Sequence, residues 1–223
     1  MLSTAHDANG SATIPARSFI TFEGGEGSGK STQLRMLADV LPDPITITRE
    51  PGGTPFAENV RHALLSGALA PLGGEVEAVA FAAARANHVD AILHPALERG
   101  ETVLCDRYVD SSRVYQKDVG PLMEPLQRLA VAGMMPDLTL IYDLEPEKGI
   151  ERVRGRDGAL DRFEGVKLDE LHRRRAAYLT IALAEPSRCV VIDGEGSADA
   201  VHERTVAAVR DRLPHLFESQ HHA

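Results

Sequence analysis

The sequence predicts an α/β fold of three layers, in which a five-stranded parallel sheet is flanked by helices. Five short apolar runs alternate along the chain with segments whose apolar residues recur at helical spacing. Strands separated by helices join through right-handed crossovers into a parallel sheet that is covered on both faces. The first apolar run also leads directly into a glycine-rich loop and a helix. In such sheets the ligand lies at the carboxyl ends of the strands, so this loop is the first place to look for a binding site.

The elements follow from the apolar spacing and from the glycines and prolines between them. We expect strands at 19–22, 45–48, 102–105, 138–144 and 189–192. We expect helices at 32–41, 55–65, 75–99, 111–116, 121–132, 147–153, 166–184 and 198–213. Pro95 should kink or restart the third of these helices, because proline lacks an N–H group and its ring clashes with the preceding turn. The polar, glycine-containing segment 155–165 predicts a mobile loop.

Length and composition bound the class of protein. The chain has 223 residues, which is enough for one α/β domain, expected at 17–215 between a disordered extension (1–16) and a short tail (216–223). A net charge of −9 argues against nucleic-acid binding. No apolar run is long enough for a membrane span, and the start lacks the pattern of a signal peptide. The two cysteines, Cys105 and Cys189, lie in apolar runs and are interpreted as reduced core thiols of a cytoplasmic protein.

The glycine-rich loop carries the strongest motif. Residues 24–31 match G-x-x-x-x-G-K-[S/T] at every fixed position, between an expected strand and an expected helix. Glycines let backbone N–H groups surround an anion, and the helix N-terminus adds partial positive charge. Lys30 is expected to reach the outer phosphates of ATP, and the Ser31 hydroxyl to bind Mg²⁺. The expected ATP-binding residues are Gly24, Gly25, Glu26, Gly27, Ser28, Gly29, Lys30, Ser31 and Thr32.

Charged residues elsewhere favour phosphoryl transfer to a small acceptor. Asp106 and Arg107 directly follow the third strand, where a carboxylate can hold Mg²⁺ or orient an acceptor oxygen and an arginine can grip a second phosphate. Taken alone, they could also form a surface ion pair. Four arginines cluster around the mobile loop, where a closed state would place one against the transferring group; these are Arg152, Arg154, Arg156 and Arg162. The run 173–175 is interpreted instead as a solvated basic face.

Four motifs together resemble the thymidylate kinase family, whose members convert dTMP to dTDP with ATP. They are the loop 22–32 with an acidic residue at Glu26, the segment 48–54 (Thr-Arg-Glu-Pro-Gly-Gly-Thr), the segment 106–116, and the segment 160–164 behind the arginines. The resemblance covers about residues 18–213. It implies a P-loop NTPase fold with a lid at about 154–165, a homodimer formed through the alanine-rich helix at 75–94 and its neighbours, and dTMP and ATP as small-molecule partners.

The resemblance also implies a role for each matching residue. Arg49 and Arg107 would hold the dTMP phosphate, Phe81 would stack on thymine and Arg85 would hydrogen-bond its edge. Tyr115 would exclude a 2′-hydroxyl, and Glu26 would meet the deoxyribose 3′-hydroxyl or water around it. The bond between Glu50 and Pro51 is expected to be cis. The implied substrate-binding set is Glu26, Arg49, Phe81, Arg85, Arg107, Ser111, Ser112, Tyr115 and Gln116; the implied catalytic set is Lys30, Arg156, Asp106 and Arg107, with Ser31 and Asp106 on Mg²⁺.

Two alternatives stay open at this point. One is another nucleoside monophosphate kinase, and the other is a P-loop ATPase or switch protein that phosphorylates no nucleotide. The lid carries an extra residue near 157–158, so Arg154 could take the catalytic place of Arg156.

Overall fold

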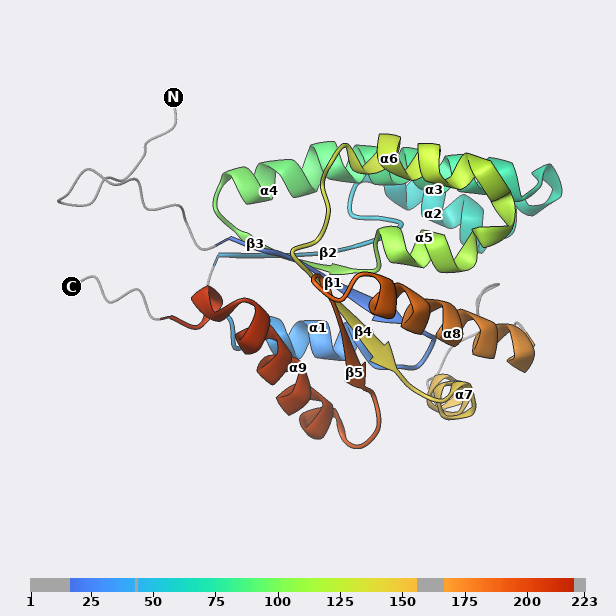
Figure 1. The fold of residues 1–223 in the computed structure, drawn as a ribbon. Helices are drawn as coiled ribbons and strands as arrows, with labels where there is room; N and C mark the ends of the chain where they lie inside the picture. The colour runs from blue at the N-terminus through green and yellow to red at the C-terminus, as the bar shows by residue number, and fades with distance from the viewer. Residues whose placement is uncertain (1–16, 43, 156–166, 219–223) are drawn as a thin grey trace, which may run out of the picture.

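One parallel sheet organises the computed structural model, which describes residues 17–42, 44–155 and 167–218. Its five strands run in the order β2-β3-β1-β4-β5 (Figure 1). They are β1 (Phe19–Gly24), β2 (Ile45–Arg49), β3 (Thr102–Asp106), β4 (Leu138–Asp143) and β5 (Cys189–Asp193). All five expected strands are therefore confirmed, together with the parallel sheet. The expected extension at 1–16 and nearly all of the expected lid lie outside the described residues.

The helices also match the expected segments. They are α1 (Lys30–Ala38), α2 (Pro55–Leu65), α3 (Gly74–His88), α4 (His94–Glu98), α5 (Val109–Tyr115), α6 (Met123–Val131), α7 (Pro146–Arg154), α8 (Leu168–Ala184) and α9 (Ala198–Arg212). Short 3-10 segments occur at η1 (Ala70–Leu72), η3 (Lys117–Leu122) and η4 (Pro214–Leu216). The first helix starts two residues earlier than expected, because its first turn is the end of the glycine loop.

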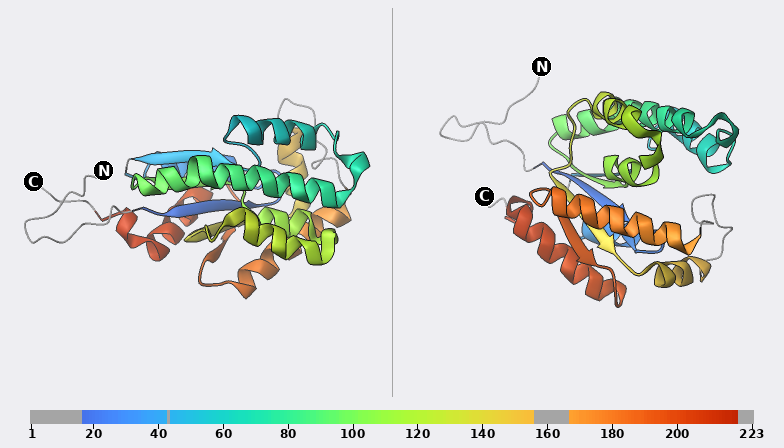
Figure 2. Two further views of the ribbon diagram at one scale, coloured as in Figure 1. Left: turned by 90° about the horizontal axis from the view of Figure 1, so that it is seen from above. Right: turned by 45° about the vertical axis from the view of Figure 1, so that its right-hand side comes forward.

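The long helical stretch before β3 is interrupted as expected, but one turn ahead of Pro95. A π-helical segment, η2 (Val89–Leu93), joins α3 to α4, and Pro95 lies in the first turn of α4. Proline has no N–H group to donate to the carbonyl of the preceding helical turn, and the wider π-helical turn ahead of Pro95 accommodates this missing hydrogen bond. As a result α3, η2 and α4 run on as one rod across the sheet (Figure 2, left).

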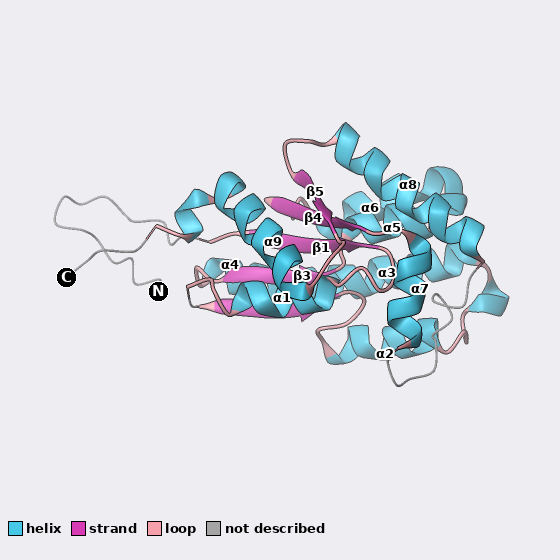
Figure 3. Ribbon diagram, turned by 90° about the horizontal axis from the view of Figure 1, so that it is seen from below, coloured by secondary structure: helices cyan, strands magenta, loops and turns pink. Residues whose placement is uncertain are grey.

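Two helical layers bury the two faces of the sheet. On one face α1 and α9 cover the strands (Figure 3), with Leu37 and Val209 fully buried against Phe22 and Leu140. On the other face η2, α4 and α6 cover β1 and β3, while α8 packs over β4 and β5. The inner strands β1, β3 and β4 are buried along almost their whole length, as is typical of a parallel sheet covered on both faces, whereas the edge strands β2 and β5 are partly exposed. No helix in the described part of the chain is long and apolar enough to cross a membrane.

The strand register aligns the carboxyl ends of three strands. Asp106 of β3 pairs with Phe22 of β1 on one side and with Arg49 of β2 on the other. The loops that follow these strands therefore start side by side at one edge of the sheet. These are the glycine loop after β1, the segment 50–54 after β2 and the Arg107 segment after β3.

Candidate active site

The glycine loop forms a cradle of backbone N–H groups in front of α1. Gly24, Gly27 and Gly29 have φ values of 134°, 70° and 96°, which side chains rarely tolerate. No side chain caps the N-terminus of α1 at Gly29, so its first N–H groups point toward the loop. This is the arrangement that binds phosphate groups.

Lys30 lies buried across this cradle. Its Nζ donates to the carbonyl oxygens of Gly24 at 3.1 Å and Gly25 at 2.6 Å. Burial, with Arg107 close by, lowers the pKa of Lys30 to about 8. Backbone carbonyls are the ammonium's main acceptors, so an incoming phosphate oxygen can take their place and supply a full negative charge.

The back of the cradle rests on α7 through two glycines. A Cβ at Gly27 would lie 2.2 Å from the carbonyl oxygen of Gly149, and a Cβ at Gly149 would lie 2.4 Å from the carbonyl oxygen of Glu26. The two backbones are thus in direct contact, with no room for a methyl group. Arg152 of α7 braces the same contact by donating to Gly194 at 3.2 Å and to Gly27 at 3.5 Å. The position of α7 therefore fixes the shape of the loop.

Ser31 and Asp106 meet at the front of the cradle. The Ser31 hydroxyl donates to Oδ2 of Asp106 across the gap between α1 and the end of β3. A hydroxyl and a carboxylate oxygen are the hard donors that Mg²⁺ takes in nucleotide sites. The residues present therefore fit the expected metal.

Arg107 extends from the end of β3 under the loop. Its φ of 68° is unusual for a residue with a side chain. Its Nη1 donates to Gly24 at 3.3 Å, to Ser111 Oγ at 3.2 Å and to Tyr178 Oη at 3.2 Å. Its Nη2 lies 3.5 Å from Glu26. The backbone strain and the contacts together hold a guanidinium at the mouth of the cradle.

A cavity of about 420 Å³ opens in front of these groups. The expected residues that line it are Glu26, Gly27, Gly29, Lys30, Ser31, Thr32, Arg49, Phe81, Arg85, Asp106, Arg107, Ser111, Ser112, Tyr115 and Gln116. Gly24 and Gly25 line instead a smaller cavity of about 180 Å³ behind the loop. Ser28 lies beneath the loop, where its hydroxyl donates to Gly25 at 2.9 Å. Of the four clustered arginines, Arg156 and Arg162 lie outside the described residues, and Arg154 lines the smaller cavity.

The far end of the larger cavity is polar and rigid. Arg85 is almost fully buried; it donates to Glu50 at 2.7 Å and to the carbonyl of Tyr108 at 2.9 Å, and it also bonds Gln127. Gln116 is also buried, and neither atom of its side-chain amide has a partner among the described residues. A buried amide without partners indicates that something else completes its hydrogen bonds, such as a ligand or water.

The structure corrects one expectation and adds a group that the sequence did not reveal. The run 173–175 is not uniformly solvated: Arg174 is 8% exposed and lies over the ring of Tyr115, 4.4 Å from its centroid. The addition is Glu50, which is buried and accepts from Arg85 and, at 2.8 Å, pairs with Nδ1 of His88. The peptide bond between Glu50 and Pro51 is cis, as expected. The sequence gives no indication that Glu50 is buried, because it lies in a loop motif without apolar periodicity.

Comparison with known proteins places these features in one family. The family model described as thymidylate kinase matches residues 22–205. The thymidylate kinase of Nitrobacter winogradskyi is 48% identical over 203 residues, which are 87% of this chain and 88% of the relative. That of Bradyrhizobium diazoefficiens is 48% identical over 204 residues, covering 87% and 90%. The crystal structure of thymidylate kinase from Ehrlichia chaffeensis superposes with a TM-score of 0.70 at 31% identity, covering 87% of this chain and 99% of that one.

The contact between Gly27 and Gly149 gives a direct test of the cradle. Gly149→Ala would place a methyl group 2.4 Å from a backbone oxygen of the loop, so the loop has to shift. A strain of about 1–3 kcal/mol is typical of such insertions, and because ATP binding requires the loop to keep the strained shape, we expect ATP affinity to fall by about fivefold to 150-fold. Isothermal titration with a non-hydrolysable ATP analogue measures it. Gly155→Ala is the matched control, since its Cβ would meet nothing closer than 3.6 Å. Equal affinity in both variants would contradict the role of the contact.

Proposed function

Because the chain belongs to the thymidylate kinase family, we propose that its glycine loop holds ATP and that its larger cavity holds dTMP. The reaction is transfer of the γ-phosphoryl group of ATP to dTMP, which gives dTDP for dTTP synthesis. The observation that carries the assignment of the two sites is the convergence of three loops on one cavity. Transfer between two phosphates requires both to lie in line, within one water-poor space.

The acceptor phosphate fits between two arginines. Arg49 is the last residue of β2, Arg107 directly follows the neighbouring strand β3, and both line the cavity. Arg49 is 54% exposed and pairs with both oxygens of Glu58 at 3.0 Å, a contact that a phosphate can displace at low cost. Arg107 is held in place before the substrate arrives. One arginine is therefore free to close on the ligand while the other stays fixed.

The nucleoside fits the opposite end of the cavity. Phe81 supplies a flat apolar surface, one helical turn from Arg85 on α3. Arg85 and the partnerless amide of Gln116 offer donors and an acceptor for the edge of thymine. Oε1 of Glu26 accepts from Tyr115, and Oε2 is buried without a partner among the described residues. Oε2 can therefore accept from the 3′-hydroxyl of the deoxyribose. Ser111 and Ser112 line the cavity beside Tyr115, whose ring would exclude a 2′-hydroxyl.

Mg²⁺ would be held by Ser31 and Asp106 and would neutralise charge on the phosphates when bound. Lys30 and the loop amides bind the β- and γ-phosphates and orient them toward the acceptor. We assign the arginine that meets the transferring group to Arg156, with Arg154 as the alternative. We also place the reaction in the cytoplasm, where the nucleotide substrates are available.

An acceptor panel tests the function. ADP release is followed with ATP, with and without Mg²⁺, over dTMP, dUMP, UMP, CMP, AMP and GMP. We expect strong turnover on dTMP with Mg²⁺, weaker turnover on dUMP, and background rates with ribonucleotides or in EDTA. Lys30→Met should abolish turnover, because the phosphates lose their buried cation. Preference for another nucleotide would assign a different monophosphate kinase, and ATP use without any acceptor would overturn the kinase assignment.

Arg85→Ala tests the base pocket separately. Loss of the guanidinium removes the base contact and leaves Glu50 without one of its partners, so we expect the KM for dTMP to rise about tenfold or more. The KM for ATP should stay within about twofold, since Arg85 lies at the far end of the cavity from the glycine loop. Steady-state kinetics with each substrate varied in turn gives both values. An equal rise in both would remove Arg85 from the base pocket.

The dimer is proposed from apolar residues exposed on neighbouring helices. Helices α2 and α6 both pack on α3. The exposed side chains are those of Phe56 on α2, Val76 and Val79 on α3, and Leu129 on α6, which are 49%, 41%, 49% and 77% exposed. Exposed apolar side chains on adjoining helices are typical of an interface between copies of a chain.

Light scattering after size exclusion tests this interface. We expect the wild type to elute at twice the chain mass and Val79→Glu to elute as a monomer, because a buried charge without a partner is costly. Leu183→Glu on α8 is the control, since Leu183 is 83% exposed and lies outside the three helices proposed for the interface. A monomeric wild type would refute the proposal.

A further inference from the structure

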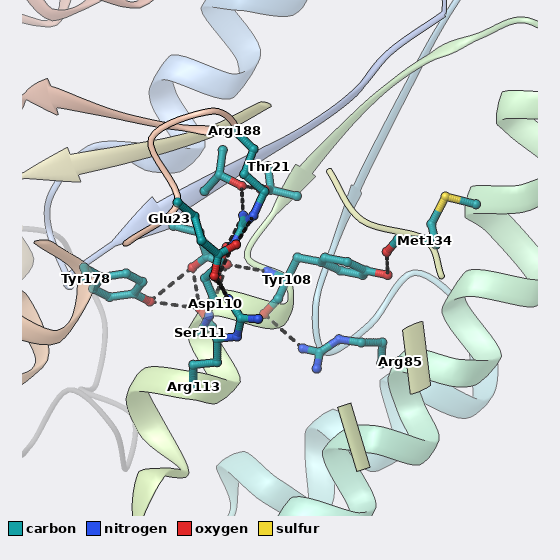
Figure 4. Close-up of polar contacts among 12 residues, drawn as sticks. Thr21, Glu23, Arg85, Tyr108, Asp110, Ser111, Arg113, Met134, Tyr178 and Arg188 are labelled. Carbon is teal, nitrogen blue, oxygen red and sulfur yellow. Dashed lines mark hydrogen bonds and ion pairs between the residues drawn. The ribbon is translucent and has the colours of Figure 1, made fainter. Parts of the chain in front are cut away.

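Glu23 lies in β1 one residue before the glycine loop, and its side chain is fully buried. Neither the motif nor the proposed function assigns it a role. In Figure 4 its carboxylate points toward Ser111 at the start of α5 and toward Tyr178 of α8. A buried carboxylate is costly unless its lone pairs are satisfied. Its surroundings therefore need an account.

Four donors converge on this carboxylate. Oε1 accepts from the backbone N–H groups of Tyr108 at 2.7 Å and Ser111 at 3.2 Å. Oε2 accepts from the hydroxyls of Ser111 at 2.6 Å and Tyr178 at 3.1 Å. The two backbone contacts hold the first turn of α5, and with it the strained residue just before Tyr108. The two hydroxyl contacts reach further, because each hydroxyl has a second partner.

The two hydroxyls contact each other at 3.0 Å, and both also contact Arg107. The same two hydroxyl oxygens, Ser111 Oγ and Tyr178 Oη, each lie 3.2 Å from Nη1 of Arg107. When both hydroxyls give their protons to Glu23, their lone pairs face the guanidinium. Glu23 and Arg107 are thus joined through two hydroxyls that are oriented by the negative charge.

We propose that Glu23 is a positioning residue for phosphoryl transfer, and that its ionised carboxylate orients Ser111 and Tyr178 so that Arg107 is held for the acceptor phosphate. Glu23 touches neither substrate in this arrangement and acts through Arg107. The inference rests on the proposed role of Arg107 at the phosphate of dTMP.

Protonation would change this arrangement. A neutral carboxyl group has one proton to donate, so Oε2 can no longer accept from both hydroxyls, and one of them must turn its proton away from Glu23. The negative charge facing Arg107 is lost in the same step. The guanidinium is then held less firmly, and its affinity for the acceptor phosphate falls.

The charged groups around Glu23 set the pH at which this occurs. Burial, followed by repulsion from Asp110, raises the pKa of Glu23 from 4.5 to about 7, against the opposing effect of Arg107. Asp110 is itself buried and pairs with Arg188 at 2.7 Å and with Arg113 at 3.1 Å (Figure 4). The other titratable groups that face Glu23 are Lys30 of α1, Cys105 of β3 and Tyr178 of α8.

The pH dependence of kcat/KM for dTMP tests the proposal, at saturating ATP and Mg²⁺ between pH 6 and 9. We expect kcat/KM of the wild type to rise with pH, with a midpoint at about 7, because the phosphates of the bound ATP keep Lys30 charged over this range. Glu23→Gln mimics the protonated form, so it should match the wild type near pH 6, fall about tenfold below it near pH 8.5, and show no midpoint at about 7. The second ionisation of the dTMP phosphate, near pH 6, is common to both enzymes and cancels in their ratio.

Two further variants separate positioning from a merely structural role. Glu185→Gln removes a partly exposed carboxylate that pairs with Arg188 and Arg113, and it should keep the wild-type profile. Tyr178→Phe keeps the ring but removes a donor to Glu23, so its midpoint should move to higher pH; it also serves if Glu23→Gln does not fold. A ratio of wild type to Glu23→Gln that is constant with pH, or an unshifted midpoint in Tyr178→Phe, would overturn the proposal.

Thermal unfolding supplies a readout that is independent of activity. Because the pKa of Glu23 is raised in the folded state, the folded protein binds more protons than the unfolded chain between pH 4.5 and about 7. The stability that Glu23 contributes is therefore full below pH 4.5 and is lost as the pH rises through 7. The Tm of Glu23→Gln minus that of the wild type should therefore increase as the pH rises from 4.5 to about 7. A difference in Tm that stays constant with pH would contradict the titration of Glu23. If the acceptor panel instead finds no turnover on dTMP, the proposed function fails, while this Tm comparison still reports on Glu23.

Discussion

The parallel pairing of β1, β3 and β2 is the constraint on which the site depends. It places Phe22, Asp106 and Arg49 in one row across the sheet, so that three loops begin at the same depth. A slip of one residue in a parallel pair would turn Asp106 to the opposite face and separate it from Ser31. The side chains of β1 and β3 are buried on both faces, so their register is held by the hydrophobic layers above and below the sheet, whereas β2 lies at the edge and is partly exposed. The apolar core therefore fixes the strand register, and the register fixes the positions of the residues that form the site.

The same edge of the sheet buries several charges, and each is satisfied by a specific partner. Glu50 accepts from Arg85 and His88, and Asp110 pairs with Arg188. Buried pairs of this kind add little net stability, but removal of one partner leaves a charge that has lost its water. The buried pairs restrict the backbone of the loops to few positions. A site for phosphoryl transfer requires such rigid loops, because it must hold two phosphates in one geometry.

Much of the fold and a large part of the site could be predicted from the sequence, because the signals are local. The strands, the glycine loop and the residues after β3 follow from periodicity and from a motif whose spacing is fixed by backbone geometry. What could not be predicted depends on contacts between distant segments. Arg174 belongs to a run that looks solvated, and only the packing of α8 beside β1 brings it over Tyr115. In the same way, Glu23 is one acidic residue in an apolar strand until Ser111 and Tyr178 are folded onto it. The positions of Arg156 and Arg162 lie outside the described residues, so their roles stay predictions.

Glu23 and Glu26 show how three residues of separation can give two carboxylates opposite properties. Burial favours the neutral form of both. At Glu26, however, the nearby cations Arg107 and Lys30, with the hydroxyl of Tyr115, outweigh burial, and the pKa is lowered below 4.5. At Glu23 the donors are mostly neutral and Asp110 adds repulsion, so burial prevails and the pKa is raised. One carboxylate then stays charged on the cavity side of Arg107, where it can accept a substrate hydroxyl, while the other titrates behind it. Arg107 is therefore held by Glu26 on the cavity side at neutral and mildly acidic pH, but is fixed on both sides only above neutrality, where Glu23 is also charged.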